Sequence, residues 1–305
     1  KLQEGITFYE KAIEIAKQHG DTYQEYCSSQ ALANILNNAC RYKEAKQYYE
    51  KVVKIALELG DKYCEASSRL ILASYCRKDC DYEMAKNEKA LDYDKEALTI
   101  AKEQGYKNLE AQAYLGLGEN YRSNNQIHMA IQHFREALEI ASKQGYENEE
   151  TQAHIGLGHT YIFDNQNQAA IRHFEEALQI ATQQRCTLLE TKAYLGLGHA
   201  NRSDNQIQTA IQHHEKTLKI AKELGNKQVE TQAYFQLGED YRTDSQIHKA
   251  VAHYDEALKM ASEHGYKTEE AQAHIGLGHA YRLDNQYQTA IQHYEKALEI
   301  AREQG

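Results

Sequence analysis

The sequence predicts an all-α fold, a solenoid in which helix–turn–helix repeats stack along the chain. The main observation is a period of forty residues: AQAYLGLGENY at 111–121 returns as TQAHIGLGHTY at 151–161 and as AQAHIGLGHAY at 271–281. A second phrase, AIQHFREALEIA at 130–141, returns as AIQHYEKALEIA at 290–301. A fixed period in this range is typical of stacked arrays, in which each unit buries its apolar face against its neighbours. Such arrays offer one long surface, which favours binding over catalysis.

Small and apolar residues recur at helical spacing in both phrases, so each repeat is expected to contain two helices. In one repeat these residues are Tyr114, Leu117, Gly118 and Tyr121, followed by Ala130, Phe134, Ala137, Leu138 and Ala141. Gly116 and Gly118 fall inside the first helix and lack the third glycine and the preceding strand of a phosphate-binding loop. We therefore interpret them as packing residues that let two helices approach closely.

Asparagine and glycine recur at fixed positions in the repeats, where helices are expected to end. A turn between the two helices repeats an asparagine, a residue that tolerates a left-handed backbone, at Asn125, Asn165, Asn205 and Asn285. The second helix is expected to end at a glycine, the common C-terminal stop, at Gly20, Gly60, Gly105, Gly145, Gly225, Gly265 and Gly305, with Arg185 as the exception. Every repeat is therefore predicted to be helix, turn, helix, glycine.

The register extends backwards into two degenerate repeats. Ala31, Ala33 and Ala45 match Gly116, Gly118 and Ala130 at a separation of 85 residues instead of 80, so five extra residues lie within 82–96. They form either an extended turn or a lengthened second helix, with Ala85 and Ala90 competing for one role. The predicted organisation is a half repeat at 1–20 (second helix only) and seven repeats at 21–60, 61–105 (with the insertion), 106–145, 146–185, 186–225, 226–265 and 266–305.

The residues from Tyr114 to Ala137 named above resemble the tetratricopeptide repeat (TPR) signature in order and spacing. The unit is forty residues long instead of thirty-four, and it lacks the usual proline after the second helix. In this it resembles the repeats of the Pins/LGN class of G-protein-signalling modulators, and more distantly those of kinesin light chains. The resemblance implies a right-handed superhelical solenoid of TPR helix–turn–helix repeats. It also implies a concave groove, lined by the first helices, that holds peptides.

The composition and net charge of the chain exclude several classes of binding partner. The net charge is −10, whereas nucleic-acid and anionic-membrane binders normally carry a basic stripe, so neither partner is expected. No apolar run is long enough to insert into a membrane. Cys76 and Cys80 sit four apart and Cys40 matches Cys80, yet a zinc site on this spacing is disfavoured against ordinary reduced thiols. We therefore expect a cytoplasmic protein without metal or cofactor.

One stripe on the first helices is the candidate binding face, because a 3, 4, 3 spacing places its residues on one side of a helix. Its members are Arg77; Gln112, Leu115, Glu119 and Arg122; Gln152 and His159; Lys192, His199 and Arg202; Gln232, Glu239 and Arg242; and Gln272, His279 and Arg282. The TPR resemblance implies that these residues line the peptide groove.

The five arginines of this stripe leave two interpretations open. Arginine binds carboxylates through two parallel hydrogen bonds, which favours an acidic linear segment of a partner as the ligand. Alternatively, the arginines pair with acids of the chain itself, such as Glu119, Glu239, Asp204 or Asp284.

No nucleophile–base pair, carboxylate dyad or metal quartet appears at credible spacing. The second helices carry a histidine stripe, but neighbouring copies are expected to lie ~10 Å apart, too far to share a metal. The preferred hypothesis is therefore a non-enzymatic interaction scaffold that binds a linear, acidic peptide. The alternative is a regulatory or sensor array of a larger protein whose enzymatic or signalling domain lies elsewhere.

The repeat at 186–225 is expected to be the least stable interior repeat. It has Asn201 where other repeats have tyrosine, His214 where they have phenylalanine or tyrosine, and Thr217 where they have alanine. Each change replaces an apolar contact with a polar group that must find a partner, at a cost of ~1–3 kcal/mol where it fails.

Overall fold

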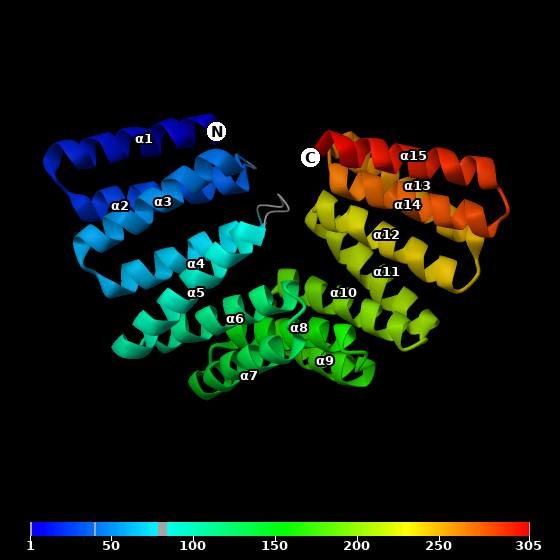
Figure 1. The fold of residues 1–305 in the computed structure, drawn as a ribbon, viewed down its shortest axis with the longest axis horizontal. Coiled ribbons are helices and arrows are strands. Elements are labelled where there is room, and N and C mark those ends of the chain that lie inside the picture. Colours follow the sequence, from blue (N-terminus) through cyan, green and yellow to red (C-terminus); the bar gives the residue numbers. More distant parts are fainter. Residues whose placement is uncertain (1, 40, 79–83, 305) are drawn as a thin grey trace. The chain divides into compact units, whose positions relative to one another are not determined.

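The computed structural model describes residues 2–39, 41–78 and 84–304, and these residues form fifteen α-helices (Figure 1). The first helices of the repeats are α2 (Thr22–Asn38), α4 (Lys62–Lys78), α6 (Lys107–Ser123), α8 (Glu147–Phe163), α10 (Thr187–Ser203), α12 (Lys227–Thr243) and α14 (Lys267–Leu283). The second helices are α1 (Leu2–His19), α3 (Tyr42–Leu59), α5 (Met84–Gln104), α7 (Ile127–Gln144), α9 (Asn167–Gln183), α11 (Ile207–Leu224), α13 (Ile247–His264) and α15 (Tyr287–Gln304). The all-α repeat solenoid predicted from the sequence is confirmed.

The chain divides into two compact units, residues 1–153 and 154–305, with the boundary inside α8. We refer to them as unit 1 and unit 2. Within each unit, helices that follow one another in sequence pack side by side, and Figure 1 shows this stacking for α1 to α7 and for α9 to α15. First helices also contact each other, as in the pairs α4 with α6 and α12 with α14. None of the described helices is long and apolar enough to cross a membrane.

The turn chemistry expected from the sequence is confirmed. The asparagines at the turn have φ angles between 57° and 62°, and Ser245 takes the same conformation in the repeat that lacks the asparagine. The described glycines after the second helices also have positive φ, and Arg185 adopts φ 56° where the other repeats have glycine. Gly305 lies outside the described residues.

The core is built by glycines of the first helices that receive an aromatic ring of the second helix. A Cβ atom on Gly118 would lie 2.7 Å from the ring of Phe134. The ring of Phe174 fills the space next to both Gly158 of its own repeat and Gly196 of the next repeat. The Phe174 ring therefore packs against two successive first helices at once. This contact confirms the prediction that these glycines are packing residues.

From Ala90 onwards, the degenerate repeat at 61–105 has the same forty-residue spacing to the following repeat as the regular repeats have. Ala90, Ala97 and Ala101 are fully buried and precede the buried Ala130, Ala137 and Ala141 by forty residues. The five extra residues therefore lie before Ala90, and α5 has 21 residues where the other helices have 17 or 18. The side chain of Ala85 lies outside the described part of the chain, as do residues 79–83.

The three polar residues of the 186–225 repeat find partners, but mostly local ones. Asn201 Nδ2 donates to Leu197 O at 2.8 Å, and Thr217 Oγ1 donates to His213 O at 3.1 Å. His214 Nδ1 lies 2.5 Å from Asp240 Oδ2, while its Nε2 has no hydrogen-bond partner among the described residues. Bonds to the preceding helical turn satisfy both Asn201 and Thr217, but Asn201 does not replace the interhelical contact that tyrosine makes with histidine at this position in other repeats.

We therefore expect amide hydrogen exchange in 194–220 to be faster than in 234–260 of the next repeat. Stability in a stack is approximately a sum of repeat and neighbour terms, so a weak repeat opens before its neighbours. Segment-resolved hydrogen exchange by mass spectrometry provides the measurement. Equal or slower exchange in 194–220 would show that the His214–Asp240 contact compensates for the lost aromatic packing.

Candidate functional site

The structure places the candidate stripe on α4, α6, α8, α10, α12 and α14, which are all first helices. In unit 1 the stripe opens into a cavity of about 330 Å³. Five of the predicted residues line it: Arg77, Gln112, Leu115, Glu119 and Gln152. The cavity therefore coincides with the face that the sequence pattern selected.

Residues of the degenerate repeat complete this cavity. Ser67, Leu70, Ile71 and Ser74 of α4 contribute two hydroxyls and an apolar wall. The sequence pattern did not predict these four, because the shifted register of 61–105 hides their equivalence to the stripe in later repeats. Gly116 and Phe134 also border the cavity.

Charges in the unit 1 cavity are nearly balanced. Arg77 Nη1 donates to Asp94 Oδ2, and Arg122 Nη2 donates to Glu119 Oε2. At the rim, Gln112 Nε2 donates to Glu149 Oε1 at 2.8 Å. Two carboxylates therefore face the cavity beside arginines that are already paired, so this part of the face has no excess positive charge.

Arg202 of unit 2 belongs to a buried network. Its Nη1 donates to Asp240 Oδ1 at 2.9 Å, and its Nη2 donates to Gln236 Oε1 at 2.9 Å. The Asp240 side chain is fully buried and also contacts the fully buried His214. Removing Arg202 would leave a carboxylate in the core without its cation, so this arginine holds α10 against α12.

Arg242 pairs within its own helix. Its Nη2 donates to Glu239 Oε2 at 2.6 Å, and Tyr254 donates its hydroxyl to Glu239 Oε1 at 2.5 Å. Burial, followed by the neighbouring Glu239, raises the pKa of Tyr254 above its ordinary value. Burial raises the pKa of Glu239 as well, but hydrogen bonds from Arg242 and Tyr254 outweigh it and leave this pKa below its ordinary value. Glu239 is therefore a carboxylate at neutral pH and neutralises Arg242.

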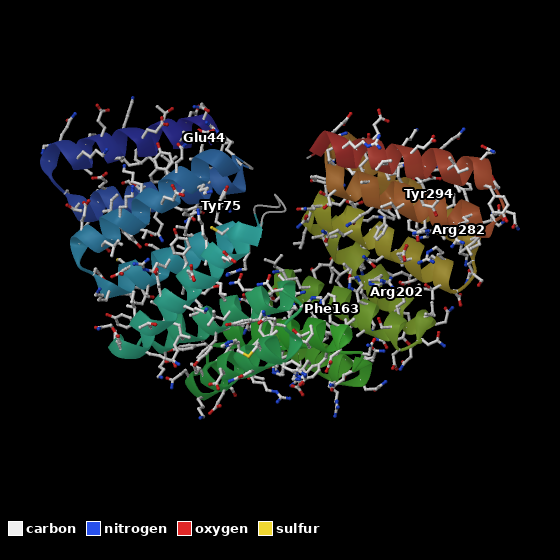
Figure 2. All side chains as sticks on the ribbon, viewed as in Figure 1. Glu44, Tyr75, Phe163, Arg202, Arg282 and Tyr294 are labelled. Atoms are coloured by element: carbon white, nitrogen blue, oxygen red, sulfur yellow. The ribbon has the colours of Figure 1, made fainter. Side chains whose placement is uncertain are left out.

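Two cations of the stripe stay without a carboxylate partner. Among the described residues, neither Lys192 nor Arg282 makes an ion pair, and both are exposed. Figure 2 shows Arg282 on α14 and, for comparison, Arg202 on α10, which is paired with Asp240. The unit 2 stripe thus carries four cations, Lys192, Arg202, Arg242 and Arg282, against the two carboxylates Glu239 and Asp240. It has an excess of positive charge in a chain whose net charge is −10.

The histidines of the stripe pack against aromatic rings of the second helices. His159 packs edge-on against Phe174, His199 against His214, and His279 against Tyr294. Burial, the nearby His214 and Arg202 lower the pKa of His199 well below its ordinary value, and burial with Arg242 lowers the pKa of His279. These two imidazoles are therefore neutral at neutral pH. His279 Nδ1 lies 2.8 Å from the Tyr294 hydroxyl, whereas His199 Nε2 is buried without a hydrogen-bond partner among the described residues. Leu195, Phe235 and Ile275 add partly exposed apolar surface.

Four of the five stripe arginines form ion pairs within the chain, and the fifth, Arg282, forms none with the described residues. Arg77, Arg122, Arg202 and Arg242 pair internally, with Asp94, Glu119, Asp240 and Glu239 respectively. Glu119 and Glu239 were anticipated, whereas Asp204 and Asp284 instead accept hydrogen bonds from glutamine side chains. Asp94 and Asp240 were missed, although Asp94 stands where later repeats have Phe134 or Tyr254. A charged residue in an aromatic column is the signal that could have revealed it.

No group of three or more metal-ligating side chains occurs in the described part of the chain. The conceivable cysteine site cannot be placed, because Cys40 and Cys80 lie outside the described residues. Cys76 is buried and forms no disulfide with another described residue.

A sequence profile of the tetratricopeptide repeat matches residues 83–143, 189–263 and 229–303, more than half of the chain. A second tetratricopeptide repeat profile matches 28–58 and 151–184. The chain belongs to the tetratricopeptide repeat family. The narrower resemblance to the Pins/LGN class stays a prediction. No curated protein matches the chain in sequence.

Solved structures share the fold at low sequence identity. The apo form of the quorum sensor NprR from B. thuringiensis is 16% identical, with a TM-score of 0.76, over 98% of this chain and 83% of that one. A Rap protein complexed with Competence and Sporulation Factor is 15% identical, with a TM-score of 0.67, over 99% and 98%. A signal transduction ATPase with a tetratricopeptide repeat sensor, from Pyrococcus horikoshii, is 16% identical, with a TM-score of 0.69, over 97% of this chain and 45% of that one.

Proposed function

We propose that this chain is a non-enzymatic scaffold whose first-helix face binds a linear, acidic segment of a partner protein. The observation that carries the proposal is the excess of positive charge on the unit 2 stripe, where Lys192 and Arg282 are exposed and make no ion pair with the described residues. Carboxylates bind such groups through charge-assisted hydrogen bonds. Partly exposed Leu195, Phe235 and Ile275 provide apolar contacts between the cations, as a peptide groove requires.

The unit 1 cavity is proposed to accept an uncharged side chain. Its arginines are paired, Glu119 and Glu149 face it, and its wall includes Leu70 and Leu115. An acidic side chain would meet these carboxylates at close range, so acidic selectivity is assigned to unit 2 alone.

The Rap protein complexed with Competence and Sporulation Factor supports ligand binding on this fold. A cytoplasmic location is part of the proposal and rests on interpreting the cysteines as reduced thiols.

A second candidate function is a sensor array within a larger protein. It is favoured by the likeness to the ATPase from Pyrococcus horikoshii, which has a tetratricopeptide repeat sensor and of which this chain covers 45%. The complete gene sequence on both sides of the 305 residues would decide between the two. A neighbouring catalytic or signalling domain would favour the sensor array.

The test begins with a pull-down by the 305-residue chain and mass spectrometry of the captured proteins. The binding segment is then titrated against Arg282→Gln and Lys192→Gln. Each loss of a charge-assisted bond costs about 1.5–3 kcal/mol, or roughly 10- to 150-fold in affinity. Added salt is also expected to weaken binding to the wild type, because exposed charges are screened.

Arg302→Gln serves as the matched control, because Arg302 is an exposed arginine on the second helix α15. Its affinity should equal that of the wild type. Arg202 is unsuitable as a test, since its removal would strand the buried Asp240. A captured segment whose affinity ignores salt and both stripe substitutions would refute the acidic-ligand proposal.

A further inference from the structure

Two pairs of histidines in unit 2 are arranged alike and take no part in the proposed peptide binding. His154 of α8 and His173 of α9 bring their Nδ1 atoms to 3.0 Å, and His274 of α14 and His293 of α15 bring theirs to 2.9 Å. The ring centroids are 5.2 Å apart in both pairs, with interplanar angles of 44° and 42°. The same geometry is therefore built twice.

The pairs arise because only two of the five regular repeats carry histidine at both of the register positions that meet between the two helices. The second-helix histidine recurs in all five, at His133, His173, His213, His253 and His293. The first-helix position is histidine in two repeats and tyrosine in the other three, at Tyr114, Tyr194 and Tyr234. The histidines that the sequence suggested as neighbours lie on second helices of successive repeats, or five residues apart on one first helix, and neither arrangement was expected to bind a metal. The partner that the structure shows lies on the first helix of the same repeat, nineteen residues earlier.

The distance between the Nδ1 atoms matches that between two ligands of one metal ion. Imidazole nitrogens bind Zn²⁺ at about 2.0–2.1 Å, which places two adjacent ligand nitrogens roughly 2.9–3.4 Å apart, depending on square or tetrahedral geometry. A neutral imidazole offers one lone pair, so the two rings now share a single proton between facing nitrogens. For a metal ion to take the place of this proton, the ring that carries the proton on Nδ1 must carry it on Nε2 instead, so that both rings stay neutral and both Nδ1 lone pairs face the metal. The rings must also tilt so that these lone pairs converge on one point.

Packing holds the rings in this orientation. Tyr161 stacks on His173 with an interplanar angle of 6°, and Tyr281 stacks on His293 with an angle of 15°. His154 and His173 are both only partly buried, which leaves access for water molecules to complete the coordination.

The surroundings favour the first pair over the second. Lys296 places a positive charge near both His274 and His293, and the nearby carboxylates Asp255 and Glu270 offset this charge only in part. The first pair has Glu176 at the register position of Lys296, three residues after the histidine of the second helix. His274 is also buried, with only 6% of its surface exposed. A cation therefore meets less repulsion and easier access at the first pair.

We propose that His154 and His173 form a binding site for a divalent transition metal ion of the Cu²⁺ or Zn²⁺ type, with water as the remaining ligands. Imidazole nitrogen suits these ions, whereas Ca²⁺ and Mg²⁺ prefer oxygen ligands. The Irving–Williams order makes Cu²⁺ the most tightly bound of these ions. The pair His274 and His293 forms a weaker copy of the same site.

The test titrates the full 305-residue chain, without a histidine tag, with Cu²⁺ alone. Calorimetry should show one tight equivalent per chain, and electron paramagnetic resonance should show two nitrogen ligands. His154→Tyr introduces the residue that three sister repeats carry at this position, so the fold is expected to be kept. This variant should bind the tight equivalent at least tenfold more weakly, whereas His274→Tyr should keep it.

His128→Gln, at an exposed histidine of α7, controls for non-specific binding and should leave the tight equivalent unchanged. Circular dichroism of each variant checks that helicity is retained. No tight equivalent in the wild type, or equal affinity in His154→Tyr, would overturn the proposal. Loss of the tight equivalent only in His274→Tyr would overturn the assignment to the first pair.

Discussion

The free energy of unfolding of unit 1 is expected to fall by up to about 4 kcal/mol between pH 4 and pH 7 because of Asp94. This side chain is fully buried, and burial raises its pKa from 3.8 to about 7, although Arg77 and Asn120 pull it down. A shift of about three pKa units corresponds to ~4 kcal/mol. Because the folded pKa is the higher one, this stabilisation is fully present below about pH 4 and is lost as the pH rises to 7.

Asp94→Asn removes the titration while keeping the shape of the side chain. Urea unfolding of the wild type and the variant is compared at pH 5, 6, 7 and 8, with hydrogen exchange in α5 and α6 locating the effect. The variant should gain stability relative to the wild type as the pH rises. Asp92→Asn is the control, since Asp92 is exposed on the same helix. A difference between Asp94→Asn and the wild type that stays constant with pH would contradict the prediction.

Gly118→Ala is expected to destabilise unit 1 by about 1–3 kcal/mol, the usual cost of overpacking a core. The new Cβ would lie 2.7 Å from ring carbons of Phe134, whose side chain is 1% exposed, so the ring would have to shift. This cost is expected to outweigh the gain of up to ~1 kcal/mol that alanine brings to a helix interior. Urea unfolding of the variant and the wild type provides the measurement.

Gly5→Ala is the matched control, because Gly5 also lies inside a helix and no atom lies within 4 Å of the position that a Cβ would take there. It should be neutral or stabilising in the same denaturation experiment. Combining Gly118→Ala with Phe134→Leu should recover part of the loss, since the two residues touch and their effects do not add. Equal stability of Gly118→Ala and Gly5→Ala would refute the packing role.

The fold could be predicted because the repeat period, the helical spacing and the turn residues all indicate the same structure. Agreement between local and global signals is what makes such a fold predictable. Phe134 and Gly118 show this well: one period separates each from its copies, and the structure brings each ring onto a glycine. The positions of Asn125 and Arg185 at positive φ follow from the same register.

The candidate site was predicted in outline only. Spacing along a helix places residues on one face, but it does not determine which acid lies across the interface. Asp94 and Asp240 come from a second helix and from the next first helix, so no pattern within one helix connects them to Arg77 or Arg202. The His154–His173 contact was missed for the same reason, since it joins two helices across a turn.

The most direct test of the central claim is to locate the bound partner segment by site-specific photocrosslinking. A photoreactive residue is placed at Gln232 or Gln272 on the first helices of unit 2, which leaves the cations Lys192 and Arg282 in place, and separately at Gln212, Ala252 or Gln292 on the second helices. The proposed function predicts crosslinks to the captured segment from the first set and none from the second. Crosslinks mainly from the second set would contradict it, because the partner would then bind the opposite side of the repeats.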